Sequence, residues 1–161
     1  MSESDSPGVF LPPPLLFAAA VAAGLPIDGE LQGWANVLQG WANVSRPAQF
    51  AGLAVALAGL ALILLSLGLF RRFRTRPEPW QPSSALITSG LYRLSRNPMY
   101  LGMAALAAGF AIYFESLASA ALLALVVAGI DRFVIQREEC YLSRRFGADY
   151  DTYRARVRRW L

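Results

Sequence analysis

An uninterrupted apolar stretch at residues 48–70 constrains this chain more than any other feature. It contains no charged residue. As a helix rising 1.5 Å per residue, it would extend roughly 34 Å, enough to cross the hydrocarbon core of a membrane. A buried helix of a soluble domain is the alternative, but such helices are usually shorter. The stretch therefore predicts a transmembrane helix.

Three further apolar runs accompany it. Residues 98–114 and 117–136 predict a helical hairpin that turns near Glu115. Residues 10–27 open with prolines, which a first helical turn tolerates, and the preceding residues are acidic, unlike those of a signal peptide. We therefore predict an all-α integral membrane protein with about four transmembrane helices, in which residues 1–161 form a single membrane domain.

Charge gives the expected orientation. Fourteen of the fifteen arginines follow residue 70, and they flank the predicted spans. Because basic loops stay in the cytoplasm, we expect the loop 71–97, the tail 137–161 and both termini there, in a bacterial inner membrane. Aromatic residues at helical spacing predict an amphipathic helical tail. A basic half can also indicate nucleic-acid binding, but nothing resembles a nucleic-acid-binding module, so we predict no such partner.

Two sets of small residues recur at helical steps: Gly52, Ala56 and Gly59, and Gly102, Ala105 and Gly109. Such faces let helices approach closely in lipid, within one chain or in a homodimer. The heptad LQGWANV occurs twice in residues 31–44. It predicts either a helix at the outer membrane interface or a duplication in a tolerant loop.

The chain has no histidine, and all its Lys and Arg residues are arginines. This excludes a Ser-His-Asp triad, Schiff-base chemistry on lysine and a histidine metal site, and we predict no metal. In an α-helix, Asp131 and Glu138 would nearly line up, as would Arg132 and Glu139, giving a charged face at the membrane boundary. The alternative is a set of arginines that reach out to the interface and form ordinary helix ion pairs.

A second polar segment precedes residues 98–114. Asn97-Pro98 predicts an extended or turn residue followed by a helix start, whose free N–H groups attract an anionic group such as a carboxylate. Arg93 and Arg96 add positive charge there. The alternative, which the sequence supports equally well, is that this segment is a basic loop on the membrane surface without a ligand.

Two motifs, in this order, resemble those of a known family. GLYRLSRNPMYLG is followed by EE-x-x-L-x-x-x-FG-x-x-Y-x-x-Y-x-x-x-V-x-R, ending at Arg159. Together they resemble the isoprenylcysteine carboxyl methyltransferase-like membrane proteins, a group that includes the phospholipid methyltransferases. The resemblance covers about residues 79–161. It implies an integral-membrane methyltransferase that uses S-adenosylmethionine and is unrelated to the Rossmann-like soluble methyltransferases.

The resemblance also implies a cytoplasmic site built by the loop 71–97 and the tail 137–161. The implied cofactor-binding residues are Arg96, Asn97, Pro98, Tyr100, Leu101, Gly102, Glu138 and Glu139. The candidate catalytic residues are Arg132, Arg137 and Glu138, and the two arginines compete for the role of a family arginine that precedes the glutamate pair. The family's frequent histidine before the proline is Asn97 here, which cannot titrate, so proton transfer at that position is excluded.

The residues are compatible with this chemistry. Methyl transfer is an in-line displacement that needs alignment and desolvation more than an acid or a base. An amine acceptor would still have to lose a proton, with help from Glu138, Glu139 or Tyr100. We therefore predict S-adenosylmethionine-dependent methyl transfer to a lipid or amphiphilic small molecule at the cytoplasmic membrane face. The alternatives are an NADPH-dependent membrane reductase of the sterol-reductase type and a non-catalytic membrane subunit.

Overall fold

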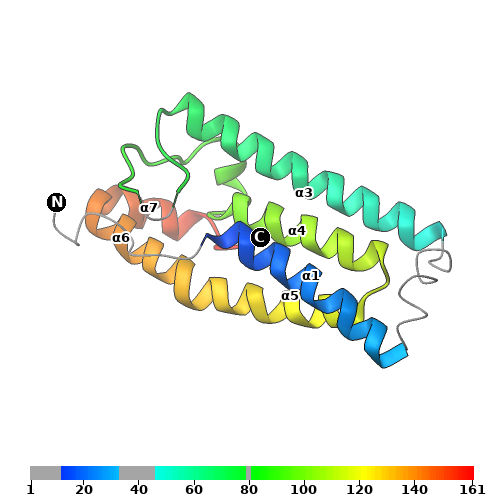
Figure 1. Ribbon diagram of the computed structural model, residues 1–161. Helices are drawn as coiled ribbons and strands as arrows, with labels where there is room; N and C mark the ends of the chain where they lie inside the picture. The colour runs from blue at the N-terminus through cyan, green and yellow to red at the C-terminus, as the bar shows by residue number, and fades with distance from the viewer. Residues whose placement is uncertain (1–11, 33–45, 79–80) are drawn as a thin grey trace.

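The computed structural model describes residues 12–32, 46–78 and 81–161, and every regular element in these ranges is helical (Figure 1). The elements are α1 (Pro13–Gln32), α3 (Arg46–Arg72), the 3-10 turn η2 (Gly90–Arg93), α4 (Pro98–Tyr113), α5 (Leu117–Gly129), the π-helical turn η3 (Ile130–Ile135), α6 (Gln136–Phe146) and α7 (Ala148–Arg156). The predicted all-α fold class is confirmed. The duplicated heptad lies outside the described residues except for Leu31 and Gln32, which end α1.

Two helices are long and apolar enough to cross a membrane: α3, and the continuous helix Leu117–Phe146 formed by α5, η3 and α6. The apolar helices α1 and α4 are shorter, and pack beside them. The turn predicted near Glu115 separates α4 from α5, where Ser116 caps α5 by accepting a hydrogen bond from the backbone N–H of Ser119.

The side chains of α3 are arranged in the opposite way to those of a soluble helix. Its buried face carries Gly52, Ala56, Gly59 and Ser66, whereas Phe50 and Leu64 on the other side are 73% and 58% exposed. Large apolar residues outside and small ones inside are expected where the surrounding solvent is lipid and helices associate by close packing.

The two predicted small-residue faces pack against each other within one chain. A Cβ placed on Gly59 would lie 2.4 Å from the backbone nitrogen of Leu106, and one on Gly109 would lie 2.4 Å from that of Ala56. Helices α3 and α4 are therefore in backbone contact. A homodimer would need some other surface.

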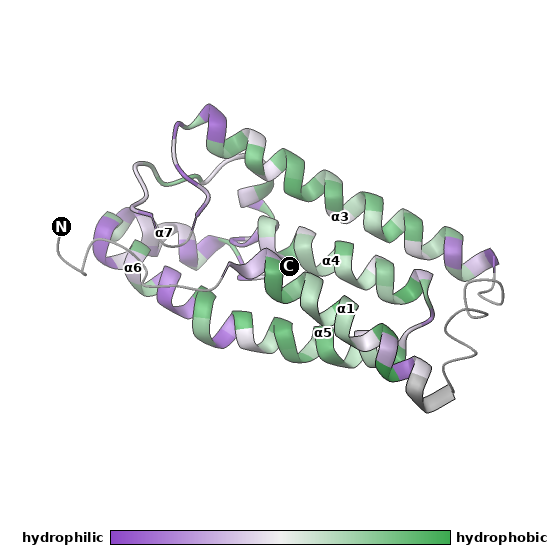
Figure 2. Ribbon diagram, viewed as in Figure 1, coloured by the Kyte–Doolittle hydropathy of each residue, from purple (hydrophilic) through white to green (hydrophobic). Residues whose placement is uncertain are grey.

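The polar part of the molecule gathers at one end of the helices (Figure 2). There α6 and α7 are separated by Gly147, whose φ of 54° suits glycine, and the loop between α3 and α4 lies over them. A small second core of Ile87, Tyr92, Tyr150 and Tyr153 holds the loop to α7. This end carries the candidate site.

Candidate functional site

A pocket of about 370 Å³ lies where the loop 76–87, the start of α4 and the helices α6 and α7 meet. Its polar lining includes Arg96, Asn97, Tyr100, Glu138 and Glu139, five of the residues predicted from the sequence. Its volume is within the range of small-molecule sites. The pocket continues toward the helices along an apolar lining of Ile63, Leu67, Phe70, Met99 and Met103.

The chain around Asn97 sets up one wall of this pocket. Asn97 (φ −131°, ψ 52°) is neither helical nor extended, and Pro98 begins α4, since proline disfavours the helical conformation in the residue before it. The backbone N–H of Asn97 donates to Ser95 Oγ at 3.1 Å, and its side-chain Nδ2 donates to the carbonyl oxygen of Arg159 at 3.1 Å. Asn97 therefore serves as a structural hydrogen-bond donor in a buried position.

Arg96 supplies a buried positive charge. Its side chain is 10% exposed, and its Nη2 forms an ion pair with Glu139 Oε1 at 3.1 Å. Its Nε and Nη1 are buried and have no hydrogen-bond partner in the described part of the chain. Buried donors of this kind are nearly always satisfied, so these two N–H groups identify a place for an anionic ligand group.

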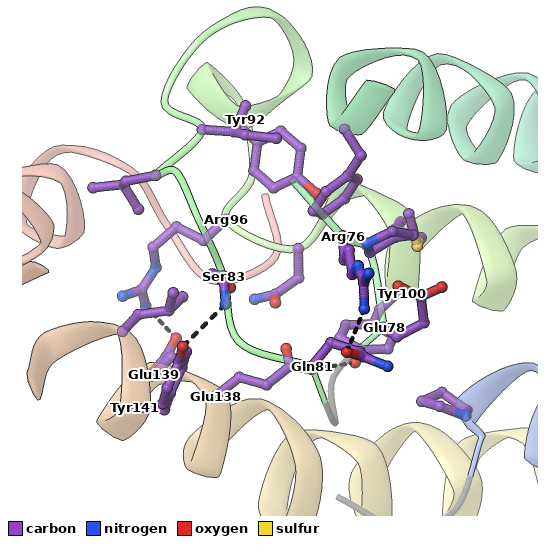
Figure 3. Close-up of a pocket in the computed structure, with 18 of the residues that line it drawn as sticks. Arg76, Glu78, Gln81, Ser83, Tyr92, Arg96, Tyr100, Glu138, Glu139 and Tyr141 are labelled. Atoms are coloured by element: carbon purple, nitrogen blue, oxygen red, sulfur yellow. Dashed lines mark hydrogen bonds and ion pairs between the residues drawn. The ribbon is translucent and has the colours of Figure 1, made fainter. Parts of the chain in front are cut away.

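The opposite side of the pocket carries two further carboxylates and an arginine. Tyr100 donates a hydrogen bond of 2.6 Å to Glu138 Oε1, and Oε2 of Glu78 is buried without a hydrogen-bond partner among the described residues. Figure 3 shows Arg96 and Glu139 on one side of the pocket and Arg76, Glu78 and Tyr100 on the other, where Arg76 donates to Gln81 at 2.7 Å. Each side of the pocket therefore carries charges of both signs.

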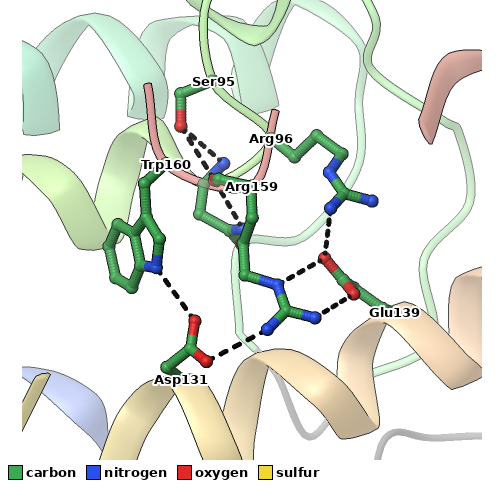
Figure 4. A network of polar contacts seen from close by, with 7 residues as sticks. Ser95, Arg96, Asp131, Glu139, Arg159 and Trp160 are labelled. Carbon is green, nitrogen blue, oxygen red and sulfur yellow. Dashed lines mark hydrogen bonds and ion pairs between the residues drawn. The ribbon is translucent and has the colours of Figure 1, made fainter. Parts of the chain in front are cut away.

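Glu139 lies at the centre of a polar network that closes the site behind Arg96 (Figure 4). Arg159 binds it with two hydrogen bonds, Nε to Oε1 at 3.1 Å and Nη2 to Oε2 at 2.6 Å. The third nitrogen of Arg159 reaches Asp131 at 3.0 Å, which also accepts a hydrogen bond from Trp160 Nε1 at 2.9 Å. The bonds to Glu139 raise the pKa of Arg159 further, so this cation stays charged.

The π-helical turn η3 explains why Asp131 shares Arg159 with Glu139 and not with Glu138. An α-helix advances about 100° per residue, which would leave Glu139 about 80° away from Asp131. A π-helical turn takes up one extra residue and turns the following helix back by about 100°, roughly into line with Asp131. Glu138 is turned to the other side by the same shift, where it meets Tyr100.

The tyrosines of the second core stay neutral. Burial is the main cause that raises the pKa of Tyr92 and Tyr153 above its ordinary value. Burial and then the charge of Glu139 raise the pKa of Tyr150 to about 12, against the opposing effect of Arg96. The hydroxyl of Tyr153 donates to the carbonyl oxygen of Tyr92 at 2.7 Å, and the Tyr141 hydroxyl accepts from the backbone N–H of Ser83 at 3.0 Å. These bonds fix the loop over the pocket.

The remaining predicted residues lie outside the pocket lining of the described structure. Pro98 is buried at the start of α4, and Leu101 follows it on the same helix. Gly102 contacts α3, where a Cβ would lie 2.9 Å from the carbonyl oxygen of Gly59. Arg132 and Arg137 are exposed, and Arg132 donates to Gln136.

Sequence reasoning missed Arg159 as a partner of Glu139, as well as the contribution of Glu78. Arg159 closes the second family motif, and that position was the available signal. Glu78 lies just before that resemblance begins, in a loop without periodicity. In the described ranges no group of three or more Cys, Asp or Glu side chains could hold a metal ion.

Comparison with known proteins identifies a family. Residues 47–149 match the family model of the phospholipid methyltransferases, a range that covers more than half of the chain. An uncharacterized protein from Haemophilus influenzae is 53% identical over 32 residues, which are 20% of this chain and 51% of that protein. The chain thus matches about half the length of this curated relative. No solved structure matches the chain. On the match to the family model, the chain belongs to the phospholipid methyltransferase family.

Proposed function

We propose that this chain transfers a methyl group from S-adenosylmethionine to a membrane-resident or amphiphilic acceptor at the cytoplasmic face of a bacterial inner membrane. The carrying observation is the pocket itself, whose lining combines Arg96, with two buried nitrogens that lack a hydrogen-bond partner in the described structure, and the carboxylates of Glu78 and Glu138. Family membership supports methyl transfer and a membrane lipid as acceptor.

The residues present suit this cofactor. Its carboxylate would accept a charge-assisted hydrogen bond from Nε or from Nη1 of Arg96, the two nitrogens that Glu139 leaves open. Its ammonium group would be held by Glu78 or Glu138, which also line the pocket. When bound, the cofactor supplies a methyl group that is already activated for displacement by a nucleophile.

The chain's own residues would then bind and orient the acceptor. Ile63, Leu67 and Met103 give an apolar surface for the hydrocarbon part of a lipid, and Phe70 and Tyr92 help to exclude water. The hydrogen-bonded pair of Tyr100 and Glu138 could accept the proton that an amine acceptor loses. In this arrangement Glu138 is the catalytic residue, and Arg96 takes the place that the sequence left to Arg132 or Arg137.

The alternatives are weaker. Nothing in the family match favours an NADPH-dependent reductase. A non-catalytic subunit would be favoured by a charged face that is closed by internal ion pairs. Asp131 and Glu139 are closed in this way, but Arg96 keeps two open N–H groups and Glu78 keeps one open oxygen within the described structure.

We also propose that α1 and α4 cross the membrane with the two longer helices, giving four spans in one membrane domain. The arginines Arg71 and Arg72 end α3 at the end of the bundle where the pocket lies. By the positive-inside rule, this end and both termini are cytoplasmic, with α6 and α7 at the membrane surface.

Calorimetric titration of the purified protein in detergent tests the proposed function. S-adenosylmethionine should bind, and Arg96→Gln should weaken binding about tenfold or more because a charge-assisted hydrogen bond to its carboxylate is lost. Arg93→Gln is the matched control, since Arg93 is exposed on η2 and outside the pocket lining. A folded wild-type protein that binds no S-adenosylmethionine would contradict the proposal.

Transfer itself is followed with a radiolabelled methyl donor and vesicles of phospholipid with an amine headgroup. Label should enter the lipid extract with the wild type and much more slowly with Glu138→Gln, which keeps an acceptor for Tyr100 but loses the charge. Cofactor binding without label transfer to any extracted membrane lipid would leave a non-lipid amphiphile as acceptor.

A further inference from the structure

Arg159 holds Glu139 in an arrangement that determines what Arg96 can do. Both carboxylate oxygens of Glu139 are bound by Arg159, at 3.1 and 2.6 Å. Arg96 reaches only Oε1, through Nη2 at 3.1 Å. A carboxylate and a guanidinium that are free to do so pair through two parallel hydrogen bonds. Arg159, and not Arg96, therefore forms the side-on pair with Glu139, through Nε and Nη2.

The backbone around Arg159 is fixed to the segment that carries Arg96. The N–H of Arg96 donates to the carbonyl oxygen of Arg158 at 2.9 Å. The carbonyl oxygen of Arg159 accepts from Ser95 Oγ and from Asn97 Nδ2, both at 3.1 Å. The guanidinium of Arg159 is thereby delivered to Glu139 from the same short segment of chain that positions Arg96.

Asp131 fixes the far side of the same guanidinium. It accepts from Nη1 of Arg159 at 3.0 Å and is itself held by Trp160 at 2.9 Å. With three nitrogens engaged, Arg159 cannot turn toward the pocket, and it is not among the residues that line it. Its influence on a ligand must pass through Glu139 and Arg96.

We propose that Arg159 is a positioning residue that keeps the Nε and Nη1 groups of Arg96 open for the carboxylate of the ligand. Without Arg159, Glu139 is free to accept a second hydrogen bond from Arg96, from Nε in a side-on pair or from Nη1 in an end-on pair, and so to occupy one of these open donors. This inference rests on the proposed function, because it takes S-adenosylmethionine as the source of the carboxylate. It goes beyond that function by assigning a selectivity role to a residue outside the pocket.

The experiment compares two ligands by calorimetry on the full chain in detergent: S-adenosylmethionine and its decarboxylated form, which lacks only the carboxylate. Arg159→Met should weaken S-adenosylmethionine binding about tenfold or more and change binding of the decarboxylated form less than about twofold. Arg158→Met is the matched control, because only its backbone oxygen takes part, and it should bind both ligands as the wild type does.

A structural role alone would weaken both ligands equally, and that result overturns the inference, as does unchanged binding of S-adenosylmethionine. A wild type that binds neither ligand instead contradicts the proposed function. Should Arg159→Met not fold, Arg159→Lys keeps the charge but cannot engage Glu139 and Asp131 together. It should show the same selectivity to a smaller extent, and wild-type selectivity would count against Arg159.

A second measurement tests the route through Glu139. In a Glu139→Gln background the neutral amide no longer competes for Arg96 as an anion. Adding Arg159→Met to this background should therefore change the affinity for S-adenosylmethionine less than about twofold. A further tenfold loss would show that Arg159 does not act through Glu139.

Discussion

The contact between α3 and α4 at Gly59 allows a sharp test of the fold that supports the pocket. A Cβ at this position would lie 2.4 Å from the backbone nitrogen of Leu106, 2.7 Å from the carbonyl oxygen of Gly102 and 2.9 Å from the carbonyl carbon of Ala105. All three atoms are backbone, so no side chain can turn away. Gly59→Ala must therefore push the two helices apart.

The magnitude follows from two opposing effects. Replacing glycine by alanine in a helix is itself favourable by about 0.5–1 kcal/mol. Overpacking costs about 1–3 kcal/mol, and a clash with rigid backbone belongs at the upper end of that range. The net expectation is a loss of about 2 kcal/mol. Gly68 on the same helix is the matched control, because a Cβ there would meet nothing within 4 Å. Gly68→Ala should therefore raise the free energy of unfolding by about 0.5–1 kcal/mol, the helix-propensity difference alone.

Unfolding of the purified variants by sodium dodecyl sulfate in mixed micelles, followed by circular dichroism, measures this difference. Gly68→Ala should be more stable than Gly59→Ala by about 3 kcal/mol. Gly59→Ala should also bind S-adenosylmethionine less tightly, since Gly102 at the contact is close in sequence to Tyr100 in the pocket wall. Equal stabilities of the two variants would refute the close packing of α3 on α4.

Three more expectations concern the site and its orientation. Tyr100→Phe removes the 2.6 Å hydrogen bond to Glu138 and should slow methyl transfer to an amine about tenfold to hundredfold with little loss of cofactor affinity; an unchanged transfer rate would remove Tyr100 from the chemistry. Cys140 is exposed and is the only cysteine, so a membrane-impermeant maleimide should label it in inverted but not in right-side-out vesicles, and the opposite pattern would reverse the proposed topology. The pKa of Tyr150 is raised from 10.0 to about 12, so its contribution to stability is fully present below about pH 10 and is lost as the pH rises toward about 12. Melting temperatures in this range should fall less steeply for Tyr150→Phe, and parallel curves would exclude Tyr150 as the titrating group.

Local pattern was enough for the helices and for several residues of the site. Helices α3 and α4 form over the runs predicted at 48–70 and 98–114, and α5 with η3 covers the run predicted at 117–136, which also contains Asp131 and Arg132. Long apolar runs favour helices because a helix satisfies its backbone hydrogen bonds within the segment. The period of the small residues correctly indicated two closely packing faces. It could not tell whether their partner was a second copy or the neighbouring helix, since both arrangements bury the same residues.

The sequence could not indicate which acidic side chains share an arginine. Straight α-helical geometry aligns Asp131 with Glu138, whereas in the structure Arg159 binds Asp131 and Glu139. The turn has no local motif, but Ile130, Val134 and Ile135 are all buried. Their spacings of four and five residues exceed the three and four of an α-helical face, so one extra residue per turn keeps all three in the core. Packing of these apolar side chains thus favours the π-helical turn. Because of that turn, Glu138 points toward Tyr100 and Glu139 points toward Arg96 and Arg159. The two adjacent glutamates therefore have different partners because of how the helix before them packs, and the charged residues alone carry no information about that packing.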